Sequence, residues 1–305
     1  MILNILLSLT ILAEILGLPV QQKILFFSQP PKAEPQVAGI KSLPQVKLSE
    51  IAPLPVADSS SKAETGAKSA LIIDLKTNKV LFDKNSQESF PIASITKLMS
   101  AVVIVENFNL SDTVPISPAA AGITGSKMHL LSGEQIKAKD LVNGMLIASA
   151  NDAAKALEEH FGHDQVVKKM NQKTEFLNLK NSHFSEATGL DSKNKSSAQD
   201  LILLTKYALN MPIISEAVKT KEYQAVSIDG RIQHLIHTTN RLLKQYPDIF
   251  GVKTGYTEEA GSCLISAADR NGHQLISVVL GFDDYNQRFS ESRNLLDWVF
   301  GNYNW

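Results

Sequence analysis

Five segments of the chain have the apolar content and length that are typical of buried strands. Two lie near residue 75 and are separated by the turn residues 76–78, and three follow one another in the last quarter of the chain. They are Ser69–Asp74, Lys79–Phe82, Gly251–Tyr256, Ser262–Asp269 and Gln274–Phe282. Because the two groups are far apart in the sequence, we expect a sheet that is assembled from both ends of the folded unit.

Between these groups, apolar residues recur with the 3.6-residue period of helices. The predicted helices are a segment from Ser94 to Val105, two stretches within Ile136–Phe161 that break at Ala148–Asn151, Gln165–Leu177, Ala198–Leu209, Ile213–Lys219 and a closing helix Gln287–Phe300. Strands Tyr223–Ile228 and Arg231–Ile236 flank an Asp-Gly turn. The predicted fold class is α/β (α+β), with a mixed sheet covered by helices and a mostly helical subdomain inserted between its strands.

The first 66 residues differ in composition from the rest. Ile2–Leu18 is mostly apolar, so residues 1–27 are predicted to be a signal peptide or an N-terminal membrane anchor, with cleavage and retention both open. The alternative is a buried or disordered apolar leader. Residues 28–66 are rich in proline and are expected to be a disordered linker, which leaves 67–305 as the catalytic domain. We therefore expect an extracytoplasmic protein whose only membrane contact is the leader, since Trp305 directly follows the closing helix.

Composition excludes several classes of function. The formal net charge of −1 gives no reason to expect a nucleic-acid partner. Cys263 is the single cysteine, so an intrachain disulfide is impossible, and its apolar surroundings favour a packed thiol. The seven histidines are scattered without a metal-ligand spacing, and the chain has no Gly-rich phosphate loop. No metal and no cofactor are predicted.

Ser94 and Lys97 are the first candidate pair for chemistry. Residues three apart lie on one face of a helix, so the Ser94 hydroxyl and the Lys97 amine can meet. Two further short motifs follow downstream, Ser149-Ala150-Asn151 at the break between two helices and Lys253-Thr254-Gly255 in a predicted strand. Each of the three motifs also has a structural explanation, such as a capping serine, a snorkelling lysine or an edge strand.

In this order and in these structural contexts, the three motifs resemble the signature of the penicillin-recognising serine acyltransferases. More closely, the chain is similar to the low-molecular-mass penicillin-binding proteins that act as serine-type D-alanyl-D-alanine carboxypeptidases, peptidase family S11. The similarity covers roughly 67–303 and includes Pro91–Met99, Ala187–Leu190, Gly251–Thr257 and Arg288 with Glu291. It implies a β-lactamase/transpeptidase-like fold with a mainly antiparallel five-stranded sheet.

The resemblance also implies a division of roles among the site residues. The catalytic residues would be Ser94, Lys97 and Ser149, and the substrate-binding residues Asn151, Lys253, Thr254, Gly255, Tyr256 and Arg288. No His-Asp pair lies close in sequence to Ser94, so the base must be an amine. Burial and a second cation, Lys253, would lower the pKa of Lys97 enough for it to take the proton of the Ser94 hydroxyl. For Arg288, a surface ion pair with Glu291 is the alternative.

The predicted function is removal of the terminal D-alanine from peptidoglycan stem pentapeptides through an acyl-enzyme on Ser94. The expected partners are a stem peptide ending in D-Ala-D-Ala and β-lactam antibiotics, which would bind Ser94 covalently. A D,D-endopeptidase that cleaves peptidoglycan cross-links and a non-catalytic penicillin-binding module remain as alternatives. A β-lactamase is less favoured, because the Glu-x-x-Leu-Asn loop of class A enzymes has no match in the chain.

Overall fold

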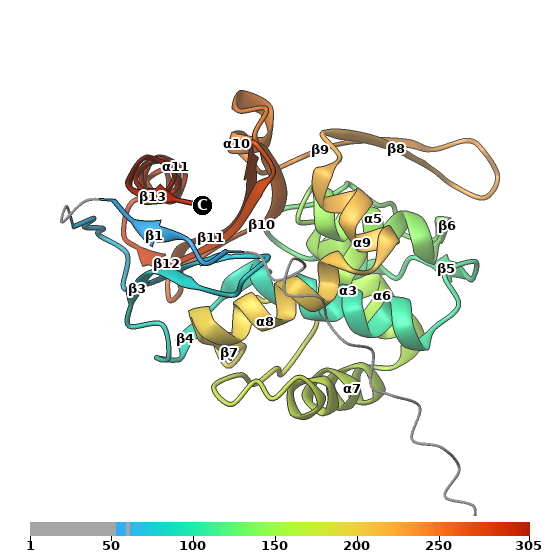
Figure 1. Ribbon diagram of the computed structural model, residues 1–305. Coiled ribbons are helices and arrows are strands. Elements are labelled where there is room, and N and C mark those ends of the chain that lie inside the picture. Colours follow the sequence, from blue (N-terminus) through green and yellow to red (C-terminus); the bar gives the residue numbers. More distant parts are fainter. Residues whose placement is uncertain (1–52, 59–61) are drawn as a thin grey trace, which may run out of the picture. The chain divides into compact units, whose positions relative to one another are not determined.

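The computed structural model describes residues 53–58 and 62–305, and its centre is a five-stranded antiparallel sheet (Figure 1). The strand order is β10-β11-β12-β2-β3, so strands from both ends of the domain lie side by side, as the sequence predicts. Their bounds are β2 Ser69–Asp74, β3 Val80–Lys84, β10 Ile249–Thr257, β11 Gly261–Arg270 and β12 His273–Phe282. The predicted leader 1–27 and residues 28–52 of the predicted linker lie outside the described residues.

Both faces of this sheet are buried, which explains why its central strands are almost wholly apolar. In β2, Ala70 and Ile72 belong to a core shared with the closing helix α11 (Gln287–Asn302), while Leu71 and Ile73 belong to the larger core of the helical subdomain. Alternate residues of a strand point to opposite faces, so one strand contributes to two cores. The sheet is therefore a middle layer, with α11 on one side and α8 (Ala198–Leu209) and the 3₁₀ turn η2 (Ala93–Ile95) on the other (Figure 1).

The described helices other than α11 lie between β3 and β10 in the chain, α11 follows β12, and most agree with the predicted ranges. The bounds are η2 Ala93–Ile95, α3 Thr96–Asn107, α4 Pro118–Gly122, α5 Ala138–Ile147, α6 Asn151–Phe161, α7 His163–Phe176, α8 Ala198–Leu209, α9 Pro212–Lys219, α10 Arg241–Gln245 and α11 Gln287–Asn302. Local signals set several ends: Ser197 caps α8 by accepting from the Asp200 N–H, and Pro212 begins α9. The fold class predicted from the sequence is confirmed.

Four short two-stranded pairs surround the main sheet. They are β1 Val56–Ala57 with β13 Tyr303–Asn304, β4 Phe90–Pro91 with β7 Lys195–Ser196, β5 Thr113–Pro115 with β6 Gln135–Lys137, and β8 Glu222–Val226 with β9 Gln233–His237. The β8–β9 hairpin agrees with the sequence prediction, and it stands apart from the five-stranded sheet. The short segments that form β5, α4 and α10 carry too little periodic apolar content for a prediction, and Ile136, where the sequence predicts a helical stretch to begin, lies in β6.

The boundary at residue 67 needs a correction. Val56 and Ala57 lie inside the predicted linker 28–66, yet they pair with Asn304 and Tyr303 in an antiparallel bridge. The folded unit thus begins at least ten residues before Ala67, because backbone hydrogen bonds tie this segment to the end of α11. Within the described part of the chain, no single helix is both long and apolar enough to cross a bilayer. The consecutive helices α8 and α9 meet those criteria only together, and they are bent by 106°.

Candidate active site

Ser94 lies in the 3₁₀ turn η2, immediately before α3, where it is partly exposed. The preceding Ala93 has a φ of +48°, an uncommon conformation for a residue with a side chain. Lys97 lies in the first turn of α3 and is fully buried, with its Nζ 2.9 Å from the Ser94 Oγ. The spacing in the sequence thus brings hydroxyl and amine into contact.

Two further oxygen atoms surround the Lys97 amine. Its Nζ donates to Asn151 Oδ1 over 2.7 Å and to the carbonyl of Thr188. The Asn151 amide cannot turn round freely, because its Nδ2 donates to the Thr124 carbonyl over 2.7 Å. A neutral amine has two N–H groups and one lone pair. Once both N–H groups bind these acceptor-only atoms, the lone pair is left for the Ser94 hydroxyl, which is the geometry a general base requires.

Burial lowers the pKa of Lys97 from its ordinary 10.5 to about 7. The carboxylates of Glu186 and Asp152 oppose the decrease, since each favours the protonated amine. A pKa near 7 leaves a substantial neutral fraction at neutral pH, so Lys97 can accept a proton there. Lys97 is not the only lysine of the site with a lowered pKa, because Lys253 is shifted as well.

Ser149 and Lys253 form a second buried pair. Ser149 occupies the break between α5 and α6 with a φ of +58°, and its Oγ accepts from Lys253 Nζ over 2.8 Å. Lys253 lies on β10 and also donates to the Thr254 carbonyl over 3.0 Å. Burial, with the charges of Lys97 and Arg288 nearby, lowers the pKa of Lys253 well below its ordinary value. The two charged groups that act on the pKa of Lys253 are both cations, whereas the two that act on the pKa of Lys97 are carboxylates.

The edge strand β10 passes close to the turn that carries Ser94. A Cβ on Gly255 would lie 2.8 Å from the Ile92 carbonyl oxygen and 3.2 Å from Cγ1 of Ile95. The family resemblance explains this glycine by the approach of substrate to the strand, and the structure adds a second reason, the contact between strand and turn. Thr254 lies beside it on β10 with its Oγ1 2.7 Å from Thr239 Oγ1.

Arg288, from the first turn of α11, lies against the same end of β10. It is buried, and its Nη1 donates to the Gly255 carbonyl over 2.7 Å. Its guanidinium lies 4.0 Å from the centroid of the Tyr285 ring and 4.8 Å from that of Phe289. These contacts contradict the alternative of a surface ion pair with Glu291. The Arg288 Nε, by contrast, is buried and has no hydrogen-bond partner.

Tyr256 follows Gly255 at the outer end of the same strand. Its side chain is exposed, and its ring meets Tyr285 edge-on at 5.1 Å. The predicted site residues thus come from η2, α3, the α5–α6 break, β10 and α11, and the three motifs meet at one place.

Several contributors to the site are not among the residues predicted from the sequence, among them Thr188, Glu186 and Thr239. Thr188 lies within Ala187–Leu190, which is similar to family sequences. No pattern in that segment indicates that a backbone carbonyl would reach Lys97, because a carbonyl belongs to every residue alike. The similarity of the segment is therefore the one signal that could direct attention to it.

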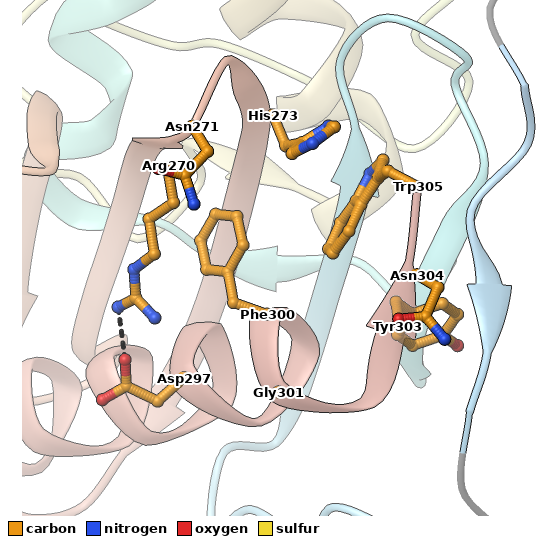
Figure 2. Close-up of a pocket in the computed structure, with 9 residues that line it drawn as sticks. All are labelled: Arg270, Asn271, His273, Asp297, Phe300, Gly301, Tyr303, Asn304 and Trp305. Atoms are coloured by element: carbon orange, nitrogen blue, oxygen red, sulfur yellow. Dashed lines mark hydrogen bonds and ion pairs between the residues drawn. The ribbon is translucent and has the colours of Figure 1, made fainter.

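A cavity of about 410 Å³ lies elsewhere, at the β11–β12 turn and the end of α11 (Figure 2). Its Arg270 is already paired with Asp297 and lies over the Phe300 ring, and His273 stacks on Trp305. No predicted site residue lines it. Across residues 53–58 and 62–305, no group of three His, Cys, Asp or Glu side chains is placed to hold a metal ion.

A serine beside a buried lysine of lowered pKa, at the edge of an antiparallel sheet, is the arrangement expected of a serine acyltransferase with an amine base. Comparison with known proteins defines this class more narrowly. Residues 56–284 match the model of the family described as D-alanyl-D-alanine carboxypeptidase, Peptidase_S11. The chain belongs to this family.

Individual relatives carry more than one name. The chain is 38% identical over 246 residues to the D-alanyl-D-alanine carboxypeptidase DacF of Bacillus subtilis. This alignment covers 78% of this chain and 63% of DacF. It is 31% identical to the D-alanyl-D-alanine endopeptidase of Escherichia coli K12, covering 82% of each. The crystal structure of the Streptomyces K15 DD-transpeptidase superposes with a TM-score of 0.75 at 29% identity, covering 79% of this chain and 99% of that one.

Proposed function

We propose that the protein is a serine D,D-carboxypeptidase that removes the terminal D-alanine from peptidoglycan stem peptides ending in D-Ala-D-Ala. The observation that carries this proposal is the position of Lys97 Nζ, held between Ser94 Oγ, Asn151 Oδ1 and the Thr188 carbonyl. Membership of the Peptidase_S11 family supports the same reaction.

In the acylation step, neutral Lys97 takes the Ser94 proton while Oγ attacks the carbonyl carbon of the penultimate D-alanine. The backbone N–H groups of Ser94 and Tyr256 would bind the oxyanion, a placement supported by the close approach of β10 to η2. Ser149, hydrogen-bonded to Lys253, passes a proton to the leaving amine of the terminal D-alanine. Water then hydrolyses the acyl-enzyme and regenerates the Ser94 hydroxyl. A β-lactam would acylate Ser94 by the same steps.

Substrate binding would use the outer edge of β10. In the strand order β10-β11-β12-β2-β3 this strand is terminal, so an extended peptide can add to it as a further strand. Lys253, Thr254 and Arg288 would supply positive charge and donors for the terminal carboxylate, and Asn151 would bind a substrate amide.

The decisive assay is release of free D-alanine from a pentapeptide ending in D-Ala-D-Ala. We expect release by the wild-type protein and none by Ser94→Ala. Lys97→Arg should also be inactive, because a guanidinium stays protonated and cannot serve as a base. Absence of D-alanine release by the wild type, or normal release by Lys97→Arg, would contradict the proposal.

Endopeptidase activity is the second candidate, and it is favoured by the Escherichia coli relative that carries that name and matches 82% of both chains. The same acylation machinery serves both reactions, so the difference lies in the peptide that the groove accepts. Incubation with a cross-linked dimer of stem peptides separates them. Faster cleavage of the dimer than of the pentapeptide would assign the protein to the endopeptidases.

We also propose that the protein acts outside the cytoplasm, since its expected substrate is peptidoglycan. Residues 1–27 would direct export or anchor the chain, and 28–52 would serve as a spacer. Cell fractionation combined with N-terminal sequencing tests this. Recovery of the chain in the cytoplasm with its N-terminus intact would contradict export.

A further inference from the structure

The loop that begins at Glu186 supplies one of the two acceptors for the Lys97 amine, through the carbonyl of Thr188. This loop is packed tightly against the turn that carries the nucleophile. Gly189 has a φ of +81°, and a Cβ on it would lie 2.1 Å from the Ala93 carbonyl oxygen. A small shift of the loop would therefore move the Thr188 carbonyl relative to Lys97 and would also displace the backbone before Ser94.

The conformation of this loop depends on the carboxylate of Glu186. One carboxylate oxygen accepts from both the N–H and the Oγ1 of Thr188, each over 2.5 Å. The other accepts from the Gly189 N–H over 2.6 Å and from Nδ2 of Asn194. A carboxylate can accept these four bonds and a longer one, over 3.4 Å, from the Asp191 N–H, whereas a neutral amide at the same position has only one acceptor oxygen. With the N–H groups of Thr188 and Gly189 turned toward Glu186, the Thr188 carbonyl is free to bind Lys97.

A second glutamate, Glu158 on α6, also supports the loop by accepting from the Ala187 N–H over 2.9 Å. Its charge is balanced by Lys155 at 3.1 Å, and His163 lies 3.1 Å from the same carboxyl group. Glu186, by comparison, binds neutral N–H and O–H donors, so its charge stays available to act on Lys97.

We propose that Glu186 is a positioning residue for the general base: its carboxylate shapes residues 186–189 so that the Thr188 carbonyl orients the Lys97 amine toward Ser94. This inference rests on the proposed acylation of Ser94. Glu186 acts through the loop and through its charge, and it does not touch the reacting atoms.

Because Glu186 is charged, its proposed role in orienting the base can be distinguished by experiment from simple structural support of the loop. The charged groups around the Lys97 amine are Glu186 and Asp152, which favour its protonated form, and the neighbouring Lys253, with Arg288 beyond it. Removing the charge of Glu186 should make Lys97 easier to deprotonate. The acid limb of the acylation rate should then move to lower pH even as the maximal rate falls, a combination that a purely structural defect does not produce.

The test is the second-order rate constant for labelling Ser94 with a fluorescent penicillin, measured from about pH 5 to about pH 10. For Glu186→Gln we expect the maximal rate to fall about tenfold or more, because the loop is misplaced. We expect its acid limb to move down by about half a pH unit or more. Glu186→Asp keeps the charge on a shorter side chain, so its maximal rate should fall while its acid limb stays at the wild-type position.

Glu134→Gln is the control, since Glu134 is another buried glutamate that accepts a loop N–H, that of Leu131, but pairs with His234 and is not among the charges that act on Lys97. Its rate profile should match that of the wild type. A wild-type profile for Glu186→Gln, or a fall in rate with an unmoved acid limb, would overturn the inference. If Glu186→Gln does not fold, a wild-type maximal rate for Glu186→Asp would overturn it equally. A wild-type protein that takes no label would refute the proposed function instead.

Discussion

Replacing Gly255 by alanine tests how the edge strand and the nucleophile turn depend on each other. The added Cβ would lie 2.8 Å from the Ile92 carbonyl oxygen, 3.2 Å from Ile95 Cγ1 and 3.4 Å from Ala93 Cβ. The first of these contacts is with backbone, which cannot rotate away as the end of a flexible side chain could. Either β10 or the turn before Ser94 must therefore move.

Relief of the contact requires a displacement of about 0.6 Å, from 2.8 Å to the 3.4 Å at which ordinary van der Waals contact begins. Overpacking of this kind costs about 1–3 kcal/mol of unfolding free energy. The effect on acylation should be larger than the loss of stability alone implies. The displaced segments carry the backbone N–H groups of Ser94 and Tyr256, which would bind the oxyanion together. We expect the acylation rate to fall about a hundredfold.

Urea unfolding and the rate of labelling with fluorescent penicillin measure the two effects. Gly301→Ala is a suitable control, because Gly301 lies in α11 and a Cβ added there would meet no heavy atom within 4 Å. That variant should keep its labelling rate and should not be destabilised, since alanine favours helix over glycine. If Gly255→Ala kept both wild-type stability and wild-type labelling, the close approach of β10 to η2 would not matter for the reaction.

Three further predictions concern charge at the site. As the pH is lowered, the acylation rate should fall to half its maximum near pH 7, because Lys97 becomes protonated there. A half-maximum near pH 10 would exclude Lys97 as a base of lowered pKa. Because the folded pKa of Lys97 is about 7 and the ordinary value 10.5, the unfolded chain binds more protons between these values. The free energy of unfolding should therefore rise with pH there, by up to about 1.4 kcal/mol per pH unit for this group, and Lys97→Met should show a smaller rise in urea titrations. Arg288→Gln should raise KM about tenfold for a peptide with a free terminal carboxylate and much less for its C-terminal amide; equal effects on both peptides would contradict carboxylate binding by Arg288.

Much of the fold could be predicted because its strands and helices carry strong apolar patterns. β2 and α8 begin and end at the predicted residues, since each is bounded by clear signals such as the turn after Asp74 and the Ser197 cap. The segment from β5 to β6 could not be predicted, because its short elements are held by contacts with α6 and not by their own periodicity. The β1–β13 bridge joins residues almost 250 positions apart and leaves no local signal.

The candidate site divides in a similar way. Ser94 and Lys97 could be paired from their spacing, because a helical turn fixes the distance between residues i and i+3. The contact between Lys97 and Thr188 could not be foreseen, because it is made by a backbone carbonyl whose direction depends on a loop conformation. The burial of Arg288 could not be predicted either, since an arginine in the first turn of a helix more often faces solvent.

The most direct test of the mechanism is to locate the acyl group. The full chain is incubated with penicillin, digested under acidic conditions and mapped by tandem mass spectrometry, with Ser149→Ala as a variant that keeps the nucleophile. The mechanism predicts one penicilloyl group per chain, on Ser94, in the wild type. Ser149→Ala lacks the proton relay, so it should label more slowly and on Ser94 alone. An adduct on Ser149 or on any other residue in either protein, or no adduct on the wild type, would contradict the assignment of Ser94 as the nucleophile.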